Sequence, residues 1–150
     1  MGHTFTNNLY HIIFSTKGRQ PFLHDDLRDQ LFAYIGGVAR NKGGILLKIN
    51  AVEDHLHLLL KIPPDIAVAT LVAAIKANSS RWIGETFPQL RDFSWQAGYS
   101  SFTVSESLKE GVARYIASQP EHHKKRSFED ELALLLQKNW VPYDPKHYVD

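Results

Sequence analysis

The sequence predicts an α+β fold: a ferredoxin-like βαββαβ antiparallel sheet with helices on one face and additional C-terminal helices. Three observations predict it. Two amphipathic helical patterns alternate with β-rich stretches, the two middle stretches are joined only by a short acidic turn, and helical patterns follow the last stretch. At 150 residues, 43% of them hydrophobic, the chain can bury one core. We therefore expect residues 1–150 to form a single domain.

The first half of the chain predicts a strand, a helix and a hairpin. Residues 9–15 (LYHIIFS) are β-branched, aromatic and apolar, which is typical of a strand. From Asp25, apolar residues recur at helical spacing until Gly43 and Gly44 end the pattern. Residues 45–52 and 56–62 are β-rich and flank Glu53 and Asp54, so they should pair as an antiparallel hairpin.

The second half predicts a helix, a strand and further helices. Residues 67–87 carry apolar residues at helical spacing, and residues 95–104 (WQAGYSSFTV) indicate a strand with a bend or bulge at Gly98. Ser107 and Glu110 have the spacing of a capping box at the start of a third helix. A final helix should begin near Ser127.

Composition excludes several function classes. With 17 basic against 16 acidic residues, the net charge of +1 provides no global attraction to nucleic acid. The absence of cysteine excludes disulfides and thiolate metal sites and fits the cytoplasm, where we expect the protein. No apolar run is long enough for a membrane span, and neither a signal peptide nor a phosphate-binding loop for a nucleotide cofactor is recognisable.

His55 and His57 are the first candidate metal ligands. On a strand, side chains alternate between faces, so both imidazoles should project from one side while Leu56 points to the other. An imidazole pair on a rigid strand supplies half of a metal site and leaves positions open for substrate oxygens. On spacing alone, two histidines on a solvated sheet face are an equal alternative.

Tyr115 and Gln119 form the second candidate group. They lie four residues apart on the predicted third helix, which places them one turn apart on the same face. A tyrosine oxygen can attack a phosphodiester and conserve its energy as a phosphotyrosine ester. Tyr115 also fits the apolar pattern of this helix, so packing in the core is the alternative. Because Pro120 follows Gln119, that residue should sit at a frayed or kinked helix end.

Several segments together resemble the single-tyrosine HUH transposases of bacterial insertion sequences, most closely the branch with the REP-associated tyrosine transposases. They are residues 52–59 (VEDHLHLL), 95–99 (WQAGY) and 115–119 (YIASQ), followed by Glu121, His122 and His123. The similarity runs from the first predicted strand to residues 128–131 (FEDE). Ser118 departs from the asparagine that family members often have before the glutamine.

The resemblance implies an activity and a site. It implies that the chain cleaves and rejoins single-stranded DNA at hairpin-containing ends through a 5′-phosphotyrosine on Tyr115. It implies that His55, His57 and Gln119 bind Mg²⁺ or Mn²⁺. It also implies a homodimer, in which the tyrosine acts either in its own subunit or in the partner.

Basic and aromatic residues supply candidate DNA contacts. The densest basic run follows the proposed nucleophile, and two further basic residues lie on the second helix; the candidates are His122, His123, Lys124, Lys125, Arg126, Lys76 and Arg81. Each could equally be part of a solvated helix face. Trp95, Tyr99 and Phe102 could stack on bases or pack in the core. The remaining histidines His3, His11, His24 and His147 match no motif.

Two alternative functions remain open. A ferredoxin-like sheet with exposed aromatic residues is also found in nucleic-acid-binding modules, so the chain could bind DNA or RNA hairpins without cutting them. A replication initiator or plasmid relaxase would use the same chemistry, but the chain shows no helicase domain. Intact His55, His57 and Tyr115 argue against the module that binds without cutting.

Overall fold

The structure, a computed structural model, describes residues 2–149. Its strands are β1 (Asn8–Ser15), β2 (Ile45–Ala51), β3 (His55–Ile62) and β4 (Ser100–Val104). Its α-helices are α1 (Asp25–Asn41), α2 (Val68–Thr86), α3 (Lys109–Ala117), α4 (Gln119–His122) and α5 (Phe128–Lys138). Three short 3₁₀ turns complete the order, at Lys17–Arg19, Pro88–Leu90 and Glu106–Leu108.

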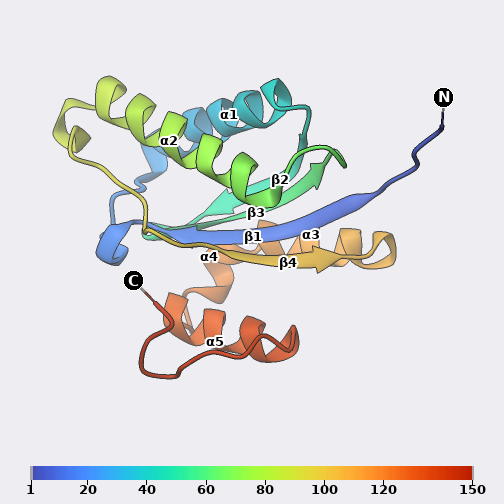
Figure 1. The fold of residues 1–150 in the computed structure, drawn as a ribbon. Coiled ribbons are helices and arrows are strands. Elements are labelled where there is room, and N and C mark those ends of the chain that lie inside the picture. The colour runs from blue at the N-terminus through green and yellow to red at the C-terminus, as the bar shows by residue number, and fades with distance from the viewer. Residues whose placement is uncertain (1, 150) are drawn as a thin grey trace.

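The four strands form one antiparallel sheet in the order β2-β3-β1-β4. The predicted hairpin is present, because β2 pairs with β3 across the acidic turn, with a register shift between Leu46 and Lys48. Figure 1 shows α1 and α2 on one face of the sheet and α3, α4 and α5 on the other. The predicted ferredoxin-like fold with additional C-terminal helices is therefore confirmed.

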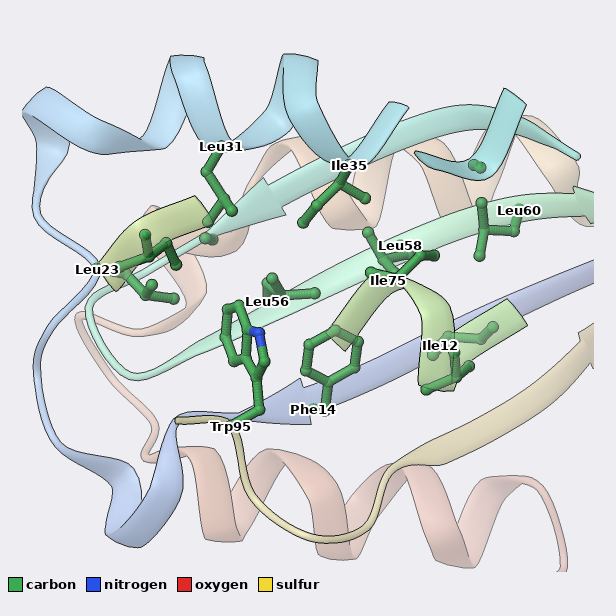
Figure 2. Close-up of a cluster of buried hydrophobic side chains, with 14 of the residues drawn as sticks. Ile12, Phe14, Leu23, Leu31, Ile35, Leu56, Leu58, Leu60, Ile75 and Trp95 are labelled. Carbon is green, nitrogen blue, oxygen red and sulfur yellow. The ribbon is translucent and has the colours of Figure 1, made fainter. Parts of the chain in front are cut away.

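Strand alternation divides the buried side chains into two clusters. The larger lies between the sheet and helices α1 and α2; Figure 2 shows members of this cluster, including Ile12, Phe14, Leu56, Leu58, Leu31, Ile35 and Ile75. The smaller joins Ile13 and Phe102 of the opposite sheet face to Phe128, Leu132 and Leu136 of α5. Burial of apolar surface thus fixes α5 beneath the sheet. Trp95 and Phe102 are both buried, which favours their core-packing alternative.

Three local predictions were wrong in detail. The strand predicted over residues 95–104 pairs continuously only from Ser100, and Trp95 forms an isolated bridge with Thr16. Between them, the Lys76 amine of α2 binds the carbonyl groups of Gln96 and Gly98. Ser107 caps no helix; it lies in the 3₁₀ turn that precedes α3. Gln119 does not share a helix with Tyr115, because α3 ends at Ala117 and Gln119 begins α4.

The break between α3 and α4 has a chemical cause. Pro120 has no N–H to continue the helical hydrogen-bond ladder. The chain therefore turns at Ser118, which agrees with the predicted kink in the helix near Gln119. Within residues 2–149, no helix is sufficiently long and apolar to cross a membrane.

Candidate functional site

His55 and His57 lie side by side on β3, as the alternation of strand side chains predicts. Leu56 between them packs into the core with α1 and α2, while both imidazoles face α3, α4 and α5. The two rings are 5.2 Å apart between centroids, and both side chains are fully buried. The prediction of two imidazoles on one face is confirmed, and the alternative of a solvated sheet face is wrong.

The two histidines converge on Glu131 of α5. The Nε2 atom of His57 lies 3.0 Å from Oε1 of Glu131, and the Nε2 atom of His55 lies 3.3 Å from the same oxygen. His123, from the segment after α4, places its own Nε2 2.9 Å from it. Three imidazoles, two from β3 and one from the segment after α4, thus surround one carboxylate oxygen.

The second oxygen of Glu131 receives the other candidate group. The Tyr115 hydroxyl donates a hydrogen bond to Oε2, and the Gln119 amide donates to the same atom at 2.9 Å. Asn50 of β2 donates to the carbonyl of Ala117 at 3.0 Å, which ties the end of α3 to the sheet. Although the helix breaks between them, Tyr115 and Gln119 still reach one atom.

Each strand histidine is supported from behind. Asp54 Oδ1 lies 2.7 Å from Nδ1 of His55, and Nε2 of His11 on β1 lies 2.8 Å from Nδ1 of His57. Partners at Nδ1 orient histidines that offer Nε2 to a metal ion. His11, which no motif singled out, is therefore part of the site.

Burial and hydrogen bonding shift the pKa values of the histidines on β1 and β3. Burial lowers the pKa of His57 to about 4 and that of His11 to about 3, so both rings are neutral at pH 7. Burial also opposes the charge on His55, but the hydrogen bond with Asp54 and the nearby carboxylate of Glu131 outweigh it and raise the pKa of that ring.

The pKa of the Tyr115 hydroxyl is raised, whereas that of the Glu131 carboxyl is lowered. Burial would raise the pKa of Glu131, but the hydrogen bonds with His123 and His57 and the nearby ring of His55 hold it well below its usual range. Burial and the neighbouring Glu131 carboxylate raise the pKa of Tyr115. The phenol is therefore protonated beside an ionised acceptor.

The donor set fits a divalent metal ion. One ligand atom from each of His55, His57, His123 and Glu131 lies within 4.8 Å of the others. Among the described residues, the buried side-chain atoms with no hydrogen-bond partner are His55 Nε2 and Gln119 Oε1, and both belong to this cluster. Nitrogen and carboxylate donors suit first-row divalent metals, including Mn²⁺.

The basic residues divide into two groups. Lys124, Lys125 and Arg126 are exposed and follow directly on His123, so this run borders the cluster. His122 contacts Tyr115, with ring centroids 4.8 Å apart. Lys76 and Arg81 lie on α2, across the sheet from the cluster, and the structure does not bring them to it. Their predicted DNA contacts remain predictions.

Sequence reasoning missed Glu131 and the position of His123 in the cluster. Glu131 lies 74 residues from His57, in a helix whose acidic first turn resembles any helix start. One signal could have pointed to Glu131: residues 128–131 end the segment that resembles the HUH transposases. His123 was assigned to the basic run because its neighbours in sequence are lysine and arginine.

Comparison with known proteins gives a consistent result. Residues 4–119 match the family described as IS200-like transposases. The ISDra2 transposase TnpA of Deinococcus radiodurans is 31% identical over 115 residues, covering 73% of this chain and 82% of that protein. The transposase of insertion sequence IS200 from Salmonella typhimurium is 30% identical over 130 residues, covering 83% and 84%.

Two solved structures are similar in fold. A crystal structure from Deinococcus radiodurans superposes with a TM-score of 0.65 at 30% identity and covers 79% of this chain and 96% of that one. A REP-associated tyrosine transposase bound to a REP hairpin superposes with a TM-score of 0.63, covering 82% and 72%. At 16% identity, the second shows a likeness of fold alone.

Proposed function

Because the chain belongs to the IS200-like transposase family, we propose that it cleaves and rejoins single-stranded DNA at hairpin-containing element ends through a covalent bond to Tyr115. One observation carries this proposal. The Tyr115 hydroxyl and the two strand histidines meet on the same buried carboxylate, within one chain. A phenol for nucleophilic attack and a set of metal ligands are thus in contact.

Tyr115 is the nucleophile in this proposal, and Glu131 accepts its proton. As the phenol oxygen forms a bond to phosphorus, its proton passes to Glu131 Oε2, to which it is already hydrogen-bonded. The bond from phosphorus to the 3′ oxygen breaks, and that oxygen takes up a proton from water to become a 3′-hydroxyl. The products are a 5′-phosphotyrosine and a free 3′ end. Attack by a 3′-hydroxyl on the phosphotyrosine reverses these steps and rejoins a strand.

His55, His57, His123 and Glu131 would hold the divalent metal, for which Mg²⁺ or Mn²⁺ is our proposal. When bound, the metal supplies Lewis-acid polarisation of the scissile phosphate. Gln119, the third ligand by resemblance, instead donates its amide N–H to Glu131, and its unpaired Oε1 is the atom it could offer to a ligand. Asp54 and His11 hold the two strand histidines in position.

The exposed basic run beside the site would contact the DNA backbone. Lys124, Lys125 and Arg126 follow His123 directly, so phosphates near the scissile bond are within their reach. The relative of known structure that carries a REP hairpin supports a hairpin as the DNA partner. A homodimer and a cytoplasmic location complete the proposal.

A covalent-adduct assay tests the function. The protein is incubated with Mn²⁺ and labelled single-stranded oligonucleotides that carry candidate element ends, and a detergent-resistant adduct is sought. We expect the wild type to form the adduct and Tyr115→Phe to lose it. An adduct that survives in Tyr115→Phe would move the nucleophile elsewhere. Hairpin binding by a wild type that forms no adduct would favour the non-catalytic binding module.

A further inference from the structure

A cavity of about 290 Å³ opens beside Tyr115, between β4, α3 and α5. Most of its wall is apolar; the lining includes Phe102, Val112, Leu135, Lys138 and Asn139. Its volume is close to that of the smallest pockets that bind small molecules, about 300 Å³. Because Tyr115 and His11 also line it, the cavity adjoins the proposed reaction centre.

Trp140 is the next residue in the chain after Asn139, which lines the cavity, and its side chain is 92% exposed. It occupies the position after the C-cap of α5, where the N–H of Trp140 bonds to the Gln137 carbonyl and the N–H of Val141 bonds to the Leu136 carbonyl. This Schellman geometry requires a left-handed residue and is usually met by glycine. Trp140 adopts it with φ 58°, an unfavourable backbone conformation for an L-residue with a side chain.

Folding alone does not account for a tryptophan at this position. The ring is almost wholly in solvent, so it contributes little to the core. Its backbone conformation costs stability that a glycine would not. Strained backbone that brings no packing is characteristic of functional sites.

We propose that the cavity and Trp140 bind unpaired nucleobases of the DNA strand next to the scissile phosphate, an inference that rests on the proposed function. One base enters the apolar cavity beside Tyr115, and a neighbouring base stacks on the exposed indole. Lys138, at the rim of the cavity, faces the strand with a positive charge. Only unpaired bases present a free planar face, so this surface selects single strands over duplex.

Trp140→Gly separates this role from a structural one. We expect its affinity for a fluorescein-labelled 20-nucleotide oligothymidine to fall by about 5- to 100-fold, the effect of losing one stacked base. Its melting temperature should rise by about 2–4 °C, because glycine relieves the left-handed strain. Trp140→Tyr retains an aromatic face and should restore most of the affinity.

The cavity is tested by filling it from α3. A Cβ at Gly111, which lines the cavity, meets no atom closer than 3.9 Å, so a larger side chain can be built there. Gly111→Leu should weaken oligothymidine binding at least tenfold, whereas Gly111→Ala, which leaves most of the cavity open, should bind nearly as wild type. Fluorescence anisotropy measures each affinity.

Three outcomes would overturn the proposal. In the first, Trp140→Gly binds DNA with wild-type affinity. In the second, its affinity falls only together with its melting temperature. In the third, sedimentation shows a shift of Trp140→Gly from dimer to monomer with no change in DNA affinity. The last would make Trp140 a contact between copies of the chain. Adduct formation is scored in parallel. Its absence from the wild type refutes the proposed function, whereas adducts together with unchanged affinity in Trp140→Gly refute only this inference.

Discussion

Glu131 is the side chain that joins the two halves of the site. One of its oxygens faces three imidazoles, and the other accepts from Tyr115 and Gln119. If it takes the phenol proton, Glu131→Gln should slow adduct formation by about 10²- to 10⁴-fold, the usual contribution of a positioned base. Single-turnover kinetics with labelled oligonucleotide and Mn²⁺ measures this rate.

Glu129→Gln is the matched control for that change. Glu129 lies two residues away and pairs with Arg19 on the surface. Its variant should form the adduct at the wild-type rate. If Glu131→Gln is equally fast, Glu131 is neither the proton acceptor nor an essential metal ligand.

His123 provides a test of the metal ligand set that does not depend on activity. Both proteins are first stripped of metal with a chelator, and Mn²⁺ binding is then measured by isothermal calorimetry. His123→Ala should bind Mn²⁺ about 100-fold more weakly than the wild type, because loss of a ligand lowers metal affinity at least as much as loss of a residue that hydrogen-bonds to a ligand. His122→Ala removes the neighbouring imidazole, which bonds to Ser118 instead of Glu131, and should bind Mn²⁺ normally. Equal affinities in the two variants would exclude His123 as a ligand.

At the level of single residues, the sequence predicted the site residues that belong to a local pattern or motif and missed those that do not. His55 and His57 follow from strand alternation, and Tyr115 follows from the family motif. Glu131 and His11 enter the site through α5 and β1, which come next to β3 only in the folded chain. No spacing rule connects positions 11, 57 and 131, since tertiary packing alone brings them together.

The α5 helix carries Glu131 and depends on its N-cap. The Ser127 side chain accepts a hydrogen bond from the backbone N–H of Asp130 at 3.2 Å. Ser127→Ala should therefore lower the free energy of unfolding by about 1 kcal/mol. Thermal unfolding should show a decrease in melting temperature of about 2–4 °C for a chain of this size.

Ser107→Ala is the corresponding control, since its sequence context also resembles a cap. Ser107 lies within a 3₁₀ turn, and its hydroxyl bonds to that of Ser105 on the exposed surface. Its variant should therefore unfold within a few tenths of a kcal/mol of the wild type. Destabilisation of both variants to the same extent would mean that the cap at Ser127 contributes nothing specific. Element types were thus predictable from periodicity, but helix ends depended on hydrogen bonds that only the fold determines.

At the scale of the whole molecule, the structure brings the proposed nucleophile Tyr115 and the histidines together within one chain. The rings of Tyr115 and His57 are 5.9 Å apart between centroids, and the Tyr115 hydroxyl bonds to the same chain's Glu131. Asn50 secures the end of α3 to the chain's own sheet. We therefore expect each subunit of a homodimer to use its own tyrosine, although the sequence left both arrangements open.

Mixing two inactive variants distinguishes the arrangements. Tyr115→Phe retains the histidines, and His57→Ala retains the nucleophile, so a shared site would be restored in heterodimers formed by co-expression. If each tyrosine serves its own subunit, every subunit of the mixture lacks one essential group, and no adduct forms. Recovery of adducts in the mixture would show that α3 of one subunit reaches the other's histidines. In that case, the hydrogen bond from Tyr115 to Glu131 would belong to a resting state that must open before cleavage.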